Sequence, residues 1–150
     1  MNRVFIIGEA GVNHNGDAAM ARRLVDVAVD AGCDAVKFQS FFTEDVVSRF
    51  APKAPYQLRT TSSTETQFDM IKRLELTPSM HKEVFAHART RGIEVFSTPF
   101  DIRSVGLLLE LGVGRIKIPS GEITNLPFLE AVGKANKDVI LSTGMSELAE

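Results

Sequence analysis

The chain has 150 residues, a length typical of one domain, and a formal net charge of −2. It lacks the excess of Lys and Arg that tracking a nucleic-acid backbone requires, and no apolar run is long enough to span a bilayer. Its single cysteine, Cys33, cannot form an internal disulfide, and its apolar neighbours predict a buried, unreactive thiol. These features predict a cytoplasmic protein with neither nucleic acid nor a membrane as a partner.

Strand-like and helix-like segments alternate along the chain. Apolar runs predict strands, stripes of 3.6-residue period predict helices, and a long polar stretch with prolines predicts a loop. In chain order we expect strand 4–8, helix 17–31, strand 35–39, loop 43–64, helix 65–74, helix 78–91, strand 93–97, helix 102–111, strand 115–118, helix 126–135 and strand 139–142. Thr77, Asp101 and Asn125 have the side chains of helix N-caps.

Strands separated by helices of this size predict right-handed βαβ units and a parallel sheet, hence an α/β fold. A closed (β/α)₈ barrel needs eight strands and about 250 residues, whereas this chain supplies five strands. An open, doubly wound sheet is complete at five strands, although the chain has no GxGxxG turn. Periodicity alone leaves both architectures open.

Polar side chains occur where each apolar run ends. Glu9 follows the first run, Lys37 and Gln39 lie in the second, and Thr98 follows the third. Lys117 and Ser142 end the fourth and fifth runs. Because catalytic groups collect at the carboxyl ends of barrel strands, these residues are candidates for one anionic-substrate site.

Side-chain alternation refines this hypothesis. Lys37 and Gln39 share a face because they are two residues apart, and Val36 and Phe38 take the other face. If Lys117 also faces inward, two ammonium groups converge and repel each other unless an anion lies between them. The competing interpretation is that both lysines extend to solvent. Glu9 and Glu122 could equally be simple ion-pair partners of these lysines.

The three histidines carry weaker signals. His14 lies between two asparagines, where a hydrogen-bonding loop residue is more common than a metal ligand, and no second ligand stands at metal spacing. His81 and His87 fall on the helix predicted over 78–91, far from any strand end, and we expect both at the surface.

Five motifs together resemble the sialic acid synthase family, which makes N-acetylneuraminate and related nonulosonates. They are GEAGVNHNG at 8–16, KFQ at 37–39, STPFD at 97–101, KIPSGE at 117–122 and LSTGM at 141–145. The resemblance covers the whole chain. It implies a (β/α)₈ TIM-type barrel in which phosphoenolpyruvate condenses with N-acetylmannosamine or a related N-acetylated hexose, with release of phosphate.

The resemblance also implies roles for individual residues. Glu122, Glu9 and Lys117 match catalytic positions. Lys37, Thr98, Lys117, Ser120 and Ser142 match the phosphoenolpyruvate-binding set. The positions that match sugar contacts are Glu9, Gln39, Glu122 and, in the long loop, Tyr56.

Family members use a divalent metal, Mn²⁺ or Mg²⁺, and work as homodimers. Their metal ligands come from later strands, and a small C-terminal antifreeze-like domain completes the site. The resemblance therefore implies that residues 1–150 are the N-terminal part of a longer synthase, without metal ligands of their own. Two other hypotheses remain open: a Schiff-base lysine aldolase of the pyruvate class, and a half-barrel that binds a ligand or partner without turnover.

Overall fold

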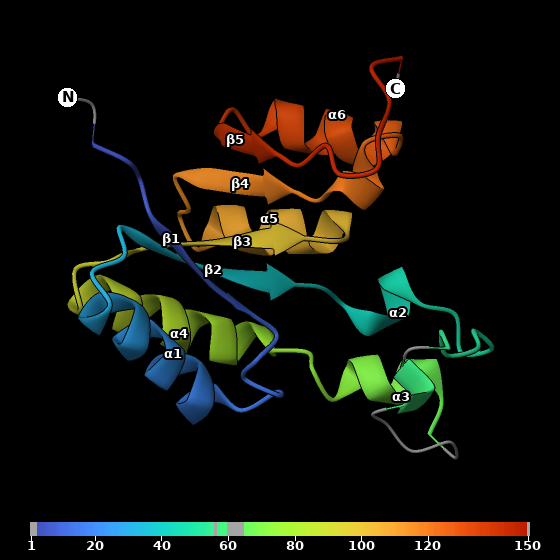
Figure 1. Ribbon diagram of the computed structural model, residues 1–150, viewed down its shortest axis with the longest axis horizontal. Coiled ribbons are helices and arrows are strands. Elements are labelled where there is room, and N and C mark those ends of the chain that lie inside the picture. The colour runs from blue at the N-terminus through green and yellow to red at the C-terminus, as the bar shows by residue number, and fades with distance from the viewer. Residues whose placement is uncertain (1–2, 56, 60–64, 150) are drawn as a thin grey trace.

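The computed structural model describes residues 3–55, 57–59 and 65–149, and it shows alternating parallel strands and helices (Figure 1). Within the described residues, no helix has both the length and the apolar character needed to cross a bilayer. The elements are β1 (Ile7–Gly11), α1 (Ala18–Asp30), β2 (Ala35–Ser40), α2 (Thr43–Val46), the 3₁₀ turn η1 (Gln57–Arg59), α3 (Gln67–Lys72), α4 (Pro78–Thr90), β3 (Glu94–Pro99), α5 (Ile102–Glu110), β4 (Arg115–Ile118), the 3₁₀ turn η2 (Ser120–Glu122), α6 (Leu126–Lys134) and β5 (Asp138–Leu141).

The strands are parallel, and they are paired in two sets, β1-β2-β3 and β4-β5. β4 runs alongside β3 (Figure 1), and the Nε of Arg115 on β4 donates to Glu94 Oε1 on β3 over 2.7 Å. Over the described residues the strands form these two hydrogen-bonded sets rather than one closed sheet, and the barrel is not closed. The chain is thus an α/β fold with parallel strands, as the alternation of segments predicts.

The hydrophobic core lies between these strands and their helices. α1 and α4 pack side by side against one face of β1, β2 and β3, and α5 packs on β3 (Figure 1). Phe38 of β2, Phe85 of α4 and Leu108 of α5 are fully buried. Truncating a buried Phe or Leu in such a core typically costs about 3–5 kcal/mol of stability, so this packing fixes the strands that carry the candidate site.

The three predicted N-caps are confirmed. Thr77 Oγ1 accepts from the N–H of Met80 at the start of α4, and Asn125 Oδ1 accepts from Phe128 at the start of α6. Asp101 is buried, and its carboxylate accepts from the N–H and the hydroxyl of Ser104 at 2.7 and 2.8 Å. These caps fix the points at which the chain leaves β3 and η2 and enters the next helix.

The first strand begins later than predicted. The apolar run starts at Val4, but pairing with β2 begins only at Ile7, which lies opposite Ala35. Val4 is 75% exposed, and Asp34 accepts a hydrogen bond from the N–H of Ile6 instead. Hydrophobicity does not reveal where the neighbouring parallel strand begins, and this decides where β1 can start to pair. As a result Glu9 lies within β1 rather than beyond its end.

The stretch predicted as one long loop contains short helices. α2 begins at Thr43, whose N–H and hydroxyl both donate to Glu75 Oε2, over 2.9 and 2.6 Å. The N–H of Phe42 donates to Asp101 Oδ2 over 2.8 Å. These buried and half-buried carboxylates therefore anchor the start of the segment that follows β2. Tyr56, a predicted sugar contact, lies outside the described residues.

The surface prediction for His81 is wrong. Its side chain is 1% exposed and lies with Val84, Phe85 and Ala88 on the buried face of α4. These four positions follow the i, i+3, i+4, i+7 spacing of a core-facing helical stripe, so the pattern itself contained the signal. His87 lies off this stripe, is half-buried, and contacts Asp26 through Nε2 at 2.8 Å.

Candidate functional site

Lys37, Glu9 and Thr98 meet at the carboxyl ends of the first three strands. The Nζ of Lys37 lies 2.6 Å from Glu9 Oε2 and donates to Thr98 Oγ1 over 3.1 Å. The register explains this meeting: Glu9 lies opposite Lys37 in β1-β2, and Thr98 lies opposite Gln39 in β2-β3. Lys37 is only 9% exposed, so its ammonium group depends on these two partners rather than on water.

Lys117 approaches the same region from β4. Its Nζ donates to Ser142 Oγ over 2.5 Å, just after β5, and to the carbonyl of Ile118 over 2.7 Å. Burial lowers the pKa of Lys117, the positive charge of Lys37 lowers it further, and the carboxylate of Glu9 opposes both effects. The two lysines therefore interact electrostatically across the sheet. Two cations and one carboxylate leave a positive surplus, and a multivalent anion is the ligand that would relieve it.

Ser120 and Ser142 lie on adjacent turns. Ser120 opens η2, and its Oγ lies 3.7 Å from the point that a Cβ on Gly144 would occupy. The two turns line one side of a pocket of about 270 Å³ that contains Gly121, Thr124 and Ser146. Hydroxyl-bearing residues and glycines line this pocket, which suits an oxyanion such as phosphate.

Gln39 and Glu9 flank Gly11, a residue with φ of +53° at the bulge that ends β1. A Cβ at this position would lie 3.3 Å from Glu9 Oε1 and 3.8 Å from Gln39 Nε2. Glycine thus permits both the positive φ and the close approach of the two side chains. Gln39 also lines a second pocket, of about 280 Å³, whose other walls are apolar: Val12, Phe41, Val46, Ile71, Leu74 and Phe100.

Glu122 closes η2 and accepts a hydrogen bond from Asn125 Nδ2 over 2.6 Å. Of the two candidate glutamates, Glu9 alone is ion-paired with a site lysine within the described residues. The simple ion-pair interpretation therefore holds for Glu9 and gains no support for Glu122. The carboxylate of Glu122 is held in place by the residue that caps α6.

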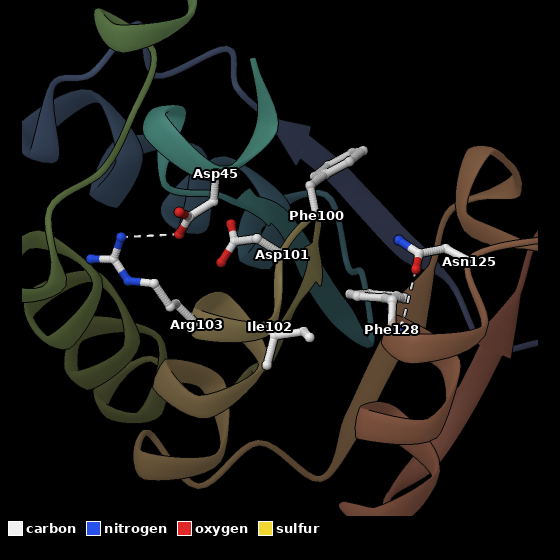
Figure 2. Close-up of a pocket in the computed structure, with 7 residues that line it drawn as sticks. All are labelled: Asp45, Phe100, Asp101, Ile102, Arg103, Asn125 and Phe128. Carbon is white, nitrogen blue, oxygen red and sulfur yellow. Dashed lines mark hydrogen bonds and ion pairs between the residues drawn. The ribbon is translucent and has the colours of Figure 1, made fainter. Parts of the chain in front are cut away.

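A larger pocket, of about 380 Å³, lies beside this region, between α2 and the starts of α5 and α6 (Figure 2). Its charged side chains already have partners: Arg103 Nη1 donates to Asp45 Oδ2 over 3.0 Å, and Asp101 caps α5. Phe100 and Phe128 form apolar walls. Phe100 and Asp101 belong to the STPFD motif, but none of the candidate catalytic or substrate-binding residues lines this pocket.

No metal site is formed by the residues that the structure describes, because nowhere among them do three or more His, Cys, Asp or Glu side chains gather around one point. The side chains present therefore do not fit a protein-bound divalent cation. The chemistry that this chain can contribute is the binding and orientation of an anion and the movement of protons.

His14 lies in the loop after β1 and is fully buried against the ring of Phe38. Its Nδ1 accepts from the N–H of Gly16 over 3.0 Å, so the neutral ring carries its proton on Nε2. Burial, and secondarily the nearby His81, lower the pKa of His14 from 6.5 to about 4. The lowered pKa favours the neutral ring, whose buried Nε2 has no hydrogen-bond partner among the described residues.

This pKa makes acid destabilisation an expected result. The unfolded chain binds the His14 proton near pH 6.5 and the folded chain only near pH 4, so stability is complete above pH 6.5 and falls between these values. The expected loss of unfolding free energy is about 3 kcal/mol. Burial also lowers the pKa of His81, so His81 adds to the dependence of stability on pH. Urea denaturation at pH 7 and pH 4 measures this loss of unfolding free energy. The loss should be smaller in His14→Gln than in the wild-type protein. An equal loss in both proteins would contradict the prediction.

Comparisons with known proteins identify the family of the chain. A family model described as the NeuB family matches residues 24–150. The chain is 54% identical over its full length to N,N'-diacetyllegionaminic acid synthase of Campylobacter jejuni, of which it covers 45%. It is 33% identical over 144 residues, 96% of its length, to human N-acetylneuraminate-9-phosphate synthase, of which it covers 40%. The chain thus spans less than half the length of these curated relatives.

The fold has a solved counterpart. The crystal structure of N-acetylneuraminic acid synthetase from Leptospira borgpetersenii, in complex with citrate, superposes with a TM-score of 0.82 at 34% identity. The match covers 99% of this chain and 47% of that one.

Proposed function

Because this chain belongs to the NeuB family, we propose that it is the N-terminal part of a (β/α)₈ barrel and supplies five of its β/α units. In the full-length protein this barrel condenses phosphoenolpyruvate with N-acetylmannosamine or a related N-acetylated hexose. The product is a nonulosonic acid, and phosphate is released. The observation that carries the proposal is that Lys37 and Lys117 each donate to a hydroxyl at the carboxyl ends of the strands, and that their charges interact.

Phosphoenolpyruvate carries a carboxylate and a phosphate, and the proposed cradle has a cation for each. Lys37 with Thr98 forms one half, and Lys117 with Ser142 forms the other. Ser120 adds a hydroxyl on the turn that faces Gly144. Binding replaces the repulsion between the two ammonium groups with charge-assisted hydrogen bonds, which are roughly twice as strong as neutral ones.

The sugar binds beside this cradle, against Glu9, Gln39 and Glu122. Tyr56 remains part of the proposal. The apolar pocket next to Gln39 suits the methyl groups of N-acetyl substituents, because it offers six apolar walls and one amide. The relative from Campylobacter jejuni is named for a diacetylated product. The apolar pocket and the name of this relative together support an N-acetylated hexose as the second substrate.

The reaction that we propose is the one that membership of the family implies. The methylene carbon of phosphoenolpyruvate attacks the aldehyde carbon of the open-chain sugar, and positive charge develops at the carbon that bears the phosphate. Water adds to that carbon, and the tetrahedral intermediate expels phosphate. Lys37 and Lys117 stabilise the departing phosphate electrostatically. Glu122 moves the proton at the aldehyde oxygen or the attacking water, and Glu9 orients the sugar and holds Lys37.

The proposal extends to a divalent metal, Mn²⁺ or Mg²⁺, whose ligands lie outside these 150 residues. None of the steps above is assigned to it. We further propose a homodimer in the cytoplasm that uses neither nucleic acid nor a membrane as a partner; the net charge of −2 supports the exclusion of nucleic acid.

One observation favours a different enzyme class. Burial lowers the pKa of Lys117, and a desolvated amine is what a Schiff-base aldolase requires. Treatment with pyruvate and borohydride distinguishes the two: the synthase leaves Lys117 unmodified, whereas a reduced adduct on Lys117 would establish the aldolase. Lys117→Arg serves as the control because arginine cannot form the adduct.

The exposed edge of β5 bears on the half-barrel alternative. Val139 and Leu141 are 45% and 46% exposed there. An unpaired apolar strand edge promotes association, so we expect residues 1–150 alone to self-associate and the full-length protein to form a discrete species. Sedimentation velocity measures both, and Val139→Lys with Leu141→Lys should reduce association of the short chain. A monodisperse, stable short chain that binds phosphoenolpyruvate without turnover would support the half-barrel.

A further inference from the structure

A buried chain of hydrogen bonds runs behind the candidate site. It joins Ser97 of β3, Ser40 of β2 and His81 of α4, none more than 1% exposed. Ser40 Oγ lies 2.7 Å from Ser97 Oγ and 2.8 Å from His81 Nε2. At the far end, His81 Nδ1 lies 3.1 Å from the carbonyl oxygen of Thr77, the residue that caps α4. The family motifs contain Ser97 but not Ser40 or His81.

The donor and acceptor of every hydrogen bond in this chain follow from the group at its end, the carbonyl oxygen of Thr77. The Thr77 carbonyl can only accept, so His81 Nδ1 must carry a hydrogen. A neutral imidazole with its proton on Nδ1 presents a lone pair at Nε2, and Ser40 must therefore donate to it. The hydroxyl of Ser97 then donates to Ser40. Each buried hydroxyl has one defined role, and burial lowers the pKa of His81, which favours the neutral ring that the chain requires.

The chain lies next to the site along the strands. Ser40 follows Gln39, and Ser97 precedes Thr98, so alternation puts each pair on opposite faces of the sheet. Gln39 and Thr98 are registered partners, and the N–H of Phe100 donates to the carbonyl of Ser40 over 3.0 Å. The serines thus tie β2 to β3 from the helix side at the level where Thr98 contacts Lys37 on the other side.

We propose that His81 is a positioning residue: by accepting from Ser40 and donating to Thr77, it ties the ends of β2 and β3 to the first turn of α4. Through these strands it sets the place of Gln39 and Thr98. The inference rests on the proposed function in one respect: it takes phosphoenolpyruvate as the ligand of the site that Gln39 and Thr98 help to form. Removing the imidazole leaves the buried hydroxyl of Ser40 without an acceptor for its hydrogen. The ends of β2 and β3 must then move for this hydroxyl to find another acceptor.

The test uses the full-length protein and three variants. His81→Phe keeps a planar aromatic ring and removes the acceptor, and His81→Gln restores an acceptor. His87→Phe is the matched control, because His87 lies on the same helix but outside the chain. We expect the Kd for phosphoenolpyruvate to rise about tenfold in H81F, to stay within about threefold in H81Q, and to remain unchanged in H87F.

Two readouts do not depend on phosphoenolpyruvate. Histidine ¹⁵N spectra should show His81 as a single neutral tautomer with the proton on Nδ1. Amide exchange at Gln39 and Thr98 should accelerate in H81F and not in H87F. If H81F does not fold, Ser40→Ala, which removes the hydroxyl that donates to His81 and so breaks the link between β2 and α4, replaces it and should accelerate the same amides.

The outcomes separate the two proposals. A proton on Nε2 of His81, or unchanged amide exchange in a folded H81F, would overturn the positioning role. Wild-type protein that fails to bind phosphoenolpyruvate would instead defeat the proposed function, and the tautomer and exchange data would still decide the role of His81.

Discussion

Lys37→Met is expected to raise the Kd for phosphoenolpyruvate by at least about 100-fold. Lys37 is nearly buried, and its ammonium group is the only partner in the described structure that neutralises the Glu9 carboxylate. The variant loses a charge-assisted contact to the ligand and leaves Glu9 to repel it. Because the Glu9 side chain is 55% exposed, most of the loss comes from the contact between Lys37 and the ligand. Removing a charged partner from such a hydrogen-bonded contact typically costs about 2–5 kcal/mol, and 100-fold corresponds to about 2.8 kcal/mol. Isothermal titration calorimetry measures the change.

The control for this variant is Lys134→Met. Lys134 lies at the end of α6 in an exposed pair with Glu130, at 3.7 Å, and its loss should leave affinity unchanged. A double variant, Lys37→Met with Glu9→Gln, should recover part of the affinity because the uncompensated carboxylate is gone. Binding by K37M within threefold of wild type would remove Lys37 from the cradle.

Glu122→Gln should lower turnover by about 10²–10⁴-fold, the usual contribution of general acid–base catalysis. The amide preserves the size of the side chain and can still accept from Asn125, so we expect KM for phosphoenolpyruvate to change less than threefold. A fall in kcat with KM unchanged is the mark of a group that acts on the reacting atoms rather than on ground-state binding. Steady-state phosphate release measures both constants.

Glu130→Gln is the matched control, since Glu130 is an exposed glutamate on α6, the helix that follows η2. It should have wild-type kinetics. Should E122Q retain full turnover, Glu122 would be a structural partner of Asn125, and Glu9 would become the first candidate for proton transfer.

Local patterns predicted much of the fold because they report local physics. β4 was predicted at its observed bounds, and the caps at Thr77, Asp101 and Asn125 follow from side chains that bond to nearby backbone. The predicted start of β1 was wrong because it depends on where the parallel strand β2 begins, which is a tertiary fact. Closure of the barrel is equally non-local, and five strands alone do not decide it.

The same distinction holds for the candidate site. Alternation along β2 predicted that Lys37 and Gln39 share a face, and the parallel register then brings Thr98 to them. The approach of Ser120 to Gly144 was not predictable, because it depends on how η2 and the turn after β5 pack. The burial of His81 was predictable from the stripe on α4, but a polar residue in a core stripe needs partners that only the fold supplies.

The most direct test of the proposed activity is phosphate release from phosphoenolpyruvate by the full-length protein, with N-acetylmannosamine or a diacetylated 6-deoxy hexose and Mn²⁺. We predict release that requires both phosphoenolpyruvate and one of these sugars, is lost in K37M, and is accompanied by an equal amount of a nonulosonic acid. Release of phosphate without any sugar, or none with either sugar, would contradict the proposed condensation.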